Sequence, residues 1–395
     1  MSDTALLRVR VGTAMSDNPD ALEAGKAAAS AAVEHLSGEA PALVMVFTTP
    51  QYDLPALLAA VRSITGEALL IGCTGSGEIV DGQYLAFGDG VGVMAMTAGP
   101  YRFAAASASG IAADPESLDR AGRDLARAAR ERAGASPHAA AVLITDSLLG
   151  DLQQFVQGVY RITGPRVAIV GGAAGDELES FKSSIFHDDA ILERGALVLW
   201  IASDRPLRVV SQHGWQPIGA PLLVTGAAGT EIAELGGRRA DEVYESQLNL
   251  AEEVKPEAFF ATSIMHPFGL TQPDGRHVIR VPRAKMPSGA LQIHGCVPSV
   301  GSAVNVMGGS TDSLLSVTEG VVSDALQDRP DASVLLTFSC AARAMIFGER
   351  APEEAGRLQA AAGEIPTFGF YCCAEFARTA GVLGTHNATL TAVAL

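Results

Sequence analysis

The stretch TFGFYCCAEF, residues 367–376, decides how the fold of this chain is interpreted. Aromatic and other apolar residues fill it as far as a pair of cysteines, a composition typical of a buried strand. Gly369 is followed six residues later by Glu375. The same spacing occurs in two earlier copies, between Gly72 and Glu78 and between Gly171 and Glu177. The chain therefore carries an internal repeat.

Each copy belongs to a longer pattern of strand, helix, glycine-bearing strand and a further strand. The predicted strands are 42–49, 68–73 and 90–97 around a helix at 54–65; 141–146, 166–177 and 196–203 around 151–163; and 333–340, 367–376 and 388–395 around 352–363. Strand–helix–strand units favour right-handed parallel connections, and the trailing strands can add in the antiparallel direction. We expect an α/β fold of mixed β-sheets covered by helices, with internally repeated strand–helix–strand units.

The best candidate for a domain boundary is GWQPIGAP, residues 214–221, which is rich in glycine and proline. It predicts an N-terminal domain at 1–220 and a C-terminal domain at 221–395. Because the sequence has no long polar linker, we expect the two domains to pack closely together.

Composition excludes several classes of partner. The 395 residues are 48% hydrophobic and 18% charged, with a formal net charge of −16. Such a chain repels phosphate backbones and anionic lipid, so neither nucleic acid nor a membrane is an expected partner. Five cysteines at irregular spacing do not suggest a disulfide framework, and the apolar runs are far shorter than the ~20 residues of a membrane helix. The start of the chain lacks a signal pattern, and we expect a cytoplasmic protein.

Seven motifs occur in one order: GCTGSGEI (72–79), GGAAGDE (171–177), GWQPIGAPLLVT (214–225), RRADEVYE (238–245), FSCAAR (338–343), FGFYCCAEF (368–376) and HNATLTAVAL (386–395). Together they resemble the FIST family, an N-terminal FIST domain followed by a FIST C-domain, over nearly the whole chain. The resemblance implies an intracellular sensory module for signal transduction that binds a small ligand such as an amino acid. The two domains fill this chain, so we expect it to signal through a separate output partner. Ala374, where the family usually has glycine, departs from the pattern.

The glycine turns supply the first candidate site residues. A strand that ends in glycines lets a ligand approach the backbone, whose N–H groups can hold an anion, and a nearby glutamate can take an amino group. The alternative is that these residues only form turns and bond the backbone. The candidate ligand-binding residues here are Gly72, Cys73, Gly75, Glu78, Gly171, Gly172, Asp176 and Glu375.

The C-terminal third supplies the others. Arg343 can bind a carboxylate through two parallel hydrogen bonds, which suits an amino acid or organic acid, or it can form a structural salt bridge. A basic residue of 280–285 is a second candidate for the same carboxylate. Cys340 ends a predicted strand, where α/β folds hold ligands, but free cysteine is commonly a small buried hydrophobe.

The cysteine pair raises a question of faces. If 367–376 is one continuous strand, Cys372 and Cys373 point to opposite sides, and Tyr371, Cys373 and Glu375 share one side, which we interpret as a pocket wall. His386 and Asn387 complete the candidates, as polar ligand contacts or as turn residues.

The leading hypothesis is a non-enzymatic sensor in which a small ligand shifts the packing of the two domains. We expect neither a metal nor a cofactor, because the eight histidines lack paired ligand spacing and no nucleotide-binding glycine motif occurs. One alternative is a thiol-dependent enzyme that uses Cys340 or Cys372, with His386 within reach of the thiol. Another is a non-catalytic adaptor, which would expose a large apolar patch.

Overall fold

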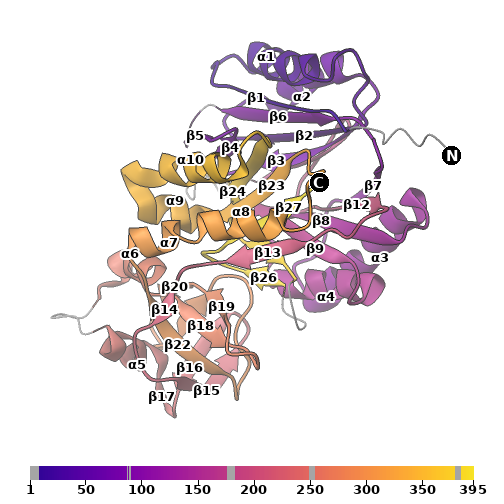
Figure 1. The fold of residues 1–395 in the computed structure, drawn as a ribbon. Coiled ribbons are helices and arrows are strands. Elements are labelled where there is room, and N and C mark those ends of the chain that lie inside the picture. The colour runs from indigo at the N-terminus through magenta and orange to yellow at the C-terminus, as the bar shows by residue number, and fades with distance from the viewer. Residues whose placement is uncertain (1–8, 87, 89, 176–182, 249–253, 379–383) are drawn as a thin grey trace.

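The computed structural model describes residues 9–86, 88, 90–175, 183–248, 254–378 and 384–395. Three β-sheets form the body of the molecule, each with helices on its outer side, and a further β-rich part is attached at one end (Figure 1). The predicted mixed α/β fold is therefore confirmed.

The three sheets share one plan. In each, a first strand and the glycine-bearing strand run parallel, while the trailing strand joins the first strand antiparallel and carries an outer edge strand. In the order edge, trailing, first and glycine strand, the strands are β1 (Val11–Ser16), β6 (Val91–Met96), β2 (Leu43–Thr48) and β3 (Leu69–Thr74); β7 (Arg102–Ala108), β12 (Ala196–Ser203), β8 (His138–Asp146) and β9 (Ala168–Ala174); and β13 (Val209–Gln212), β27 (Leu390–Ala394), β23 (Leu335–Cys340) and β24 (Thr367–Cys372).

A hairpin from another unit completes every sheet. The first sheet ends in β10 (Ile185–His187) and β11 (Ala190–Leu192), the second in β25 (Glu375–Ala377) and β26 (Thr385–His386), and the third in β4 (Glu78–Val80) and β5 (Gln83–Leu85). Each hairpin follows the glycine strand of its own unit in sequence but pairs with the glycine strand of a different unit. The exchange is cyclic, so the three units are related by an approximate threefold arrangement.

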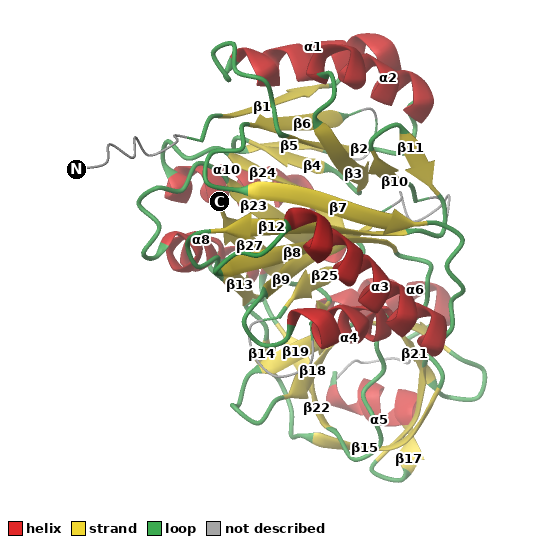
Figure 2. Cartoon of the chain, turned by 90° about the vertical axis from the view of Figure 1, so that its right-hand side faces the viewer, coloured by secondary structure: helices red, strands yellow, loops and turns green. Residues whose placement is uncertain are grey.

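Helices cover the outer faces, while the inner faces of the three sheets pack against one another (Figures 1 and 2). The central core holds apolar side chains from all three sheets, including Phe47, Ile144 and Phe338. The covering helices are α1 (Ala21–Glu34) and α2 (Leu54–Thr65) on the first sheet, α3 (Pro115–Ala133) and α4 (Leu152–Thr163) on the second, and α7 (Thr311–Leu315), α8 (Thr318–Leu326), α9 (Ala341–Phe347), η1 (Gly348–Arg350) and α10 (Ala351–Ala362) beside the third.

The repeated glycine has a packing reason. A Cβ added at Gly72 would lie 1.8 Å from the carbonyl oxygen of Val46, its partner on the neighbouring parallel strand. At Gly171 and Gly369 the corresponding distances to a carbonyl oxygen are 2.0 and 1.8 Å. Only glycine permits so close an approach of two backbones, and this accounts for one glycine in each copy.

The β-rich part lies mainly between β13 and α7, at the bottom of Figure 1. Its sheet contains β14 (Gln216–Pro217), β15 (Leu222–Ala228), β16 (Glu231–Leu235), β17 (Arg238–Arg239), β18 (Phe268–Thr271), β19 (His277–Arg280), β20 (Pro282–Lys285), β21 (Leu291–Ile293) and β22 (Ala303–Gly308), and its helices are α5 (Ala240–Gln247) and α6 (Pro256–Met265).

The boundary at residue 220 stays a prediction. Strands β4, β5 and β13 precede it and lie in the third sheet, and strands β25 and β26 follow it and lie in the second. None of the helices in the described ranges is both long enough and apolar enough to span a membrane.

Candidate functional site

The three glycine strands meet at their carboxyl ends. The residue four positions after each repeat glycine donates its backbone N–H to a carbonyl of another unit: Ser76 to Tyr371 at 2.8 Å, Gly175 to Thr74 at 2.9 Å and Cys373 to Ala173 at 3.1 Å. These bonds close a ring around the threefold centre. The sequence motifs therefore converge in space, although they lie about 100 and 200 residues apart.

A cavity of about 360 Å³ opens beside this centre, between the second unit, the third unit and the β-rich part. The described lining residues are Ser147, Leu148, Phe260, Val281, Arg283, His294, Cys340, Ala341, Ala342, Met345, Cys373 and Asn387. Its volume falls in the range of small-ligand sites, and such sites combine apolar walls with a few polar groups that orient the ligand. Three residues predicted from the sequence, Cys340, Cys373 and Asn387, meet here.

Asn387 brings an unused hydrogen-bond donor to the cavity. Its side chain is buried, and its Oδ1 accepts the backbone N–H of Val281 at 3.4 Å. The amide group Nδ2 has no partner in the structure. A buried donor without a partner costs free energy, so a bound acceptor at this position is favoured.

Arg283 and His294 come from the β-rich part. Arg283, on β20, is exposed and belongs to the basic stretch 280–285 that the sequence offered for a carboxylate. His294 Nε2 lies 2.9 Å from the carbonyl oxygen of Cys373, so this nitrogen carries the hydrogen. Burial and the nearby Arg283 charge lower the pKa of His294. The ring is therefore neutral at neutral pH, which leaves Arg283 as the cationic group among these three side chains.

Behind the cavity wall, two thiols share one carboxyl group. Cys372 donates to Glu375 Oε1 at 3.4 Å, and Thr389 donates its backbone N–H to Oε2 at 3.1 Å. The Cys340 thiol faces the same carboxyl. Burial raises the pKa of Glu375 to about 8, and burial, followed by the Glu375 charge, raises the pKa of both thiols. These thiols are therefore protonated at neutral pH and are weak nucleophiles.

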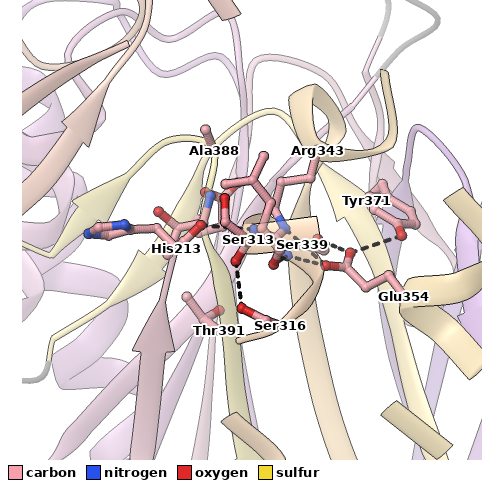
Figure 3. Close-up of polar contacts among 12 residues, drawn as sticks. His213, Ser313, Ser316, Ser339, Arg343, Glu354, Tyr371, Ala388 and Thr391 are labelled. Carbon is pink, nitrogen blue, oxygen red and sulfur yellow. Dashed lines mark hydrogen bonds and ion pairs between the residues drawn. The ribbon is translucent and has the colours of Figure 1, made fainter. Parts of the chain in front are cut away.

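Arg343 lies away from the cavity, in a fully buried network (Figure 3). Its Nε donates to Glu354 Oε1 at 2.9 Å, and its Nη2 donates to the carbonyl oxygen of Leu314 at 2.8 Å. Ser339 and Tyr371 donate to the other oxygen of the same carboxylate, at 2.6 and 2.9 Å. The guanidinium is engaged in a structural salt bridge, the alternative that the sequence left open, and does not reach the cavity.

The predicted continuity of 367–376 is wrong. Strand β24 ends at Cys372, residues 373 and 374 form a bend, and β25 begins at Glu375. The alternation of faces is lost at the bend. Glu375 therefore contacts Cys372 and Cys340, while Cys373 lines the cavity and Tyr371 bonds Glu354.

The first copy of the repeat keeps its candidates in the core. Gly72, Cys73 and Gly75 lie at or beside the end of β3, and Cys73 is fully buried with its pKa raised by burial. Glu78 is fully buried, neither carboxyl oxygen has a hydrogen-bond partner, and burial raises its pKa. This carboxyl is therefore neutral at neutral pH and does not present a charge to a ligand.

The second copy departs from the other two. Gly171 and Gly172 lie on β9 against β25, while Asp176 and Glu177 lie outside the described residues. In strand register, Glu78 pairs with Phe370 and Glu375 with Gly172, two equivalent positions; the third, Cys73, pairs with Ile185. At that register position the second hairpin thus has isoleucine where the other two have glutamate.

His386 lines a separate cleft. Its Nε2 lies 2.8 Å from the carbonyl oxygen of Ala377, and burial lowers its pKa to about 4. The cleft, of about 620 Å³, also contains His213, Gln272 and His277. His386 is thus placed away from the cavity that Cys340 lines. Within the described ranges, no group of three or more His, Cys, Asp or Glu side chains is arranged to hold a metal ion.

Family comparison agrees with the order of the motifs. The FIST N domain matches residues 42–238, and the FIST C domain matches residues 240–378. The chain belongs to the FIST family. FIST domains form a signal-transduction sensory family, and the cavity described above lies where residues matched by the two domains meet.

Relatives of this FIST protein cover its whole length. Uncharacterised proteins of Mycobacterium bovis and Mycobacterium tuberculosis (strain CDC 1551 / Oshkosh) are each 29% identical over 96% of this chain and 97% of their own. Among solved structures, cyanuric acid hydrolase from A. caulinodans aligns with 98% of this chain and 99% of its own at 9% identity, with a TM-score of 0.37, too small a likeness to support an argument.

Several cavity residues were not among the sequence candidates. Ser147, Phe260 and His294 come from a loop, a helix and a strand end with no distinctive motif. Arg283 was included only as part of the stretch 280–285. The one signal that points to it is the basic character of RVPRAK in an acidic chain.

Proposed function

We propose that this FIST protein is an intracellular sensor that binds a small carboxylate in the cavity between its second unit, its third unit and the β-rich part. The observation that carries the proposal is the unpartnered Nδ2 of buried Asn387 in an otherwise mainly apolar cavity, with Arg283 at its wall. A carboxylate supplies the acceptor that Asn387 lacks and the negative charge that a guanidinium binds in a bidentate manner.

The location of the cavity supports a signalling role. Phe260, Arg283 and His294 belong to the β-rich part, whereas Cys340 and Asn387 belong to the body. A ligand that bridges these parts has higher affinity for the arrangement in which they are close, and it therefore shifts the population towards that arrangement. A separate output protein would read the change.

Thiol chemistry has weaker support. Cys340 lines the cavity, but burial and Glu375 raise its pKa, and the proposed histidine partner, His386, lines another cleft. A reactive cysteine needs a lowered pKa or an adjacent base. We therefore assign no catalytic role to Cys340 or Cys372.

The proposal is tested by thermal unfolding with a panel of small carboxylates. A ligand at about 100 times its Kd stabilises the native state by about 2.7 kcal/mol. We expect this shift in the wild type and in Arg120→Gln, a control at an exposed arginine of α3, and its loss in Arg283→Gln. A panel that leaves the midpoint unchanged, or an Arg283→Gln variant that responds like the wild type, overturns the proposal.

A further inference from the structure

The cavity also indicates which carboxylates it selects, an inference that rests on the proposed function. The side-chain groups that can meet a ligand's polar end are donors. Asn387 offers the two hydrogens of Nδ2, because its Oδ1 already accepts from Val281. Arg283 offers only donors, since a guanidinium has no acceptor.

The acceptors near the site are already engaged. The carbonyl oxygen of Cys373 accepts from His294 Nε2. Glu375, the carboxyl group behind Cys340, receives hydrogen bonds from Cys372 and Thr389 and has no solvent exposure. With its pKa raised to about 8 by burial, this group is mostly protonated at neutral pH and does not act as a counter-ion.

An ammonium group in this cavity would therefore lack a partner. None of the described lining residues is an aspartate or a glutamate. Burying a cation without an acceptor is costly, and a nearby guanidinium repels it as well. The α-ammonium of an amino acid would stand beside the carboxylate that Arg283 and Asn387 attract, so the two requirements conflict.

The rest of the wall favours an apolar body. Leu148 and Met345 are 45% and 37% exposed, and Phe260 and Val281 line the same space. A ligand that covers these side chains removes apolar surface from water. At about 30 Å³ for one water molecule, 360 Å³ corresponds to roughly twelve waters, room for a ligand of about ten non-hydrogen atoms.

We infer that the ligand is an apolar monocarboxylic acid without an ammonium group, such as a branched aliphatic or aryl-alkyl acid, and that the site discriminates against the amino acid of the same skeleton. The carboxylate lies between Arg283 and the Nδ2 of Asn387. The apolar chain extends against Leu148, Phe260 and Met345.

Two matched pairs of compounds test this by calorimetric titration of the full chain: 4-methylpentanoate against leucine, and 3-phenylpropionate against phenylalanine. Within each pair the compounds differ only by the ammonium group. We expect at least one acid to bind, with an affinity at least tenfold higher than that of its amino acid. Equal or tighter binding of the amino acid overturns the inference and leaves the proposed function standing. If no carboxylate of a broader panel binds either, the proposed function fails as well.

A charge variant provides a second readout. Asn387→Asp keeps the oxygen that accepts from Val281 and replaces the unpartnered donor by a carboxylate oxygen. We expect the acid to bind at least tenfold more weakly and the preference to shift towards the amino acid. Gln272→Glu adds the same charge in the other cleft and should leave both affinities unchanged. Unchanged selectivity in Asn387→Asp would show that Nδ2 does not meet the ligand.

Discussion

Glu375 combines complete burial with two thiol neighbours, and this makes it a sensitive reporter of pH. Its pKa is about 8 in the folded protein against an ordinary value of 4.5. Between these values the folded chain holds a proton at Glu375 that the unfolded chain has released. The contribution of this group to the free energy of unfolding therefore falls as pH rises through the window, by up to about 1.4 kcal/mol per pH unit.

Replacement by a neutral isostere should remove this dependence. In Glu375→Gln, the free energy of unfolding relative to wild type should increase steadily between pH 5 and pH 8, because the variant has no carboxyl group to ionise. Urea unfolding at pH 5, 6.5 and 8 measures the difference, and Glu257→Gln, at an exposed glutamate of α6, serves as the control. A difference that stays constant across this range would mean that Glu375 ionises at an ordinary pH in the folded protein.

At the scale of elements, the repeat glycines hold the parallel strands together. Gly72→Ala would place a methyl group against the carbonyl oxygen of Val46, at a point where both neighbours are backbone atoms that cannot turn aside. Overpacking of a rigid core costs about 1–3 kcal/mol or more, and we expect a loss at the upper end of this range.

The matched control is another glycine with the opposite expectation. Gly356 lies within α10, and an added Cβ would have its nearest neighbour 4.0 Å away. Gly356→Ala should raise the free energy of unfolding by about 0.5–1 kcal/mol through helix propensity alone. Chemical denaturation of both variants gives the two signs. A harmless Gly72→Ala would return the first glycine turn to the list of ligand contacts.

Local pattern predicted the elements well but not their partners. The helix expected at 54–65 coincides with α2, and the strand expected at 196–203 coincides with β12, because apolar periodicity and capping residues act over short distances. Strand β4 has only three residues and pairs with β24 almost 300 residues later, so no periodic signal marks its destination.

The same limit applies to the site. Cys340, Cys373 and Asn387 follow recognisable strand motifs, so a sequence can indicate them as neighbours of strand ends. Phe260 and His294 reach the cavity only because the β-rich part packs against the body. Arg343 could be assigned to Glu354 only once α9, α10 and β23 were placed around one buried carboxylate.

For the whole molecule, the exchange of hairpins makes the three units interdependent. Separation of the chain at residue 220 would remove β25 from the edge of β9 and leave β4 without β24, its partner in the third sheet. It would also expose the inner faces of the first two sheets, because the central core includes Phe338, Phe368 and Phe370 from the third unit. Unpaired strand edges and uncovered apolar faces favour aggregation over folding.

We therefore expect residues 1–220, produced alone, to lack the dispersed amide NMR spectrum and the cooperative thermal transition that the full chain should have. Residues 221–395 should behave likewise in the three-sheet body, and mixing the fragments during refolding should restore both signals, because the missing strands are then supplied in trans. A fragment 1–220 that gives a dispersed spectrum and melts cooperatively on its own would contradict this view. Its first two sheets would then be stable without the borrowed hairpin, and the boundary at 220 would separate two autonomous domains.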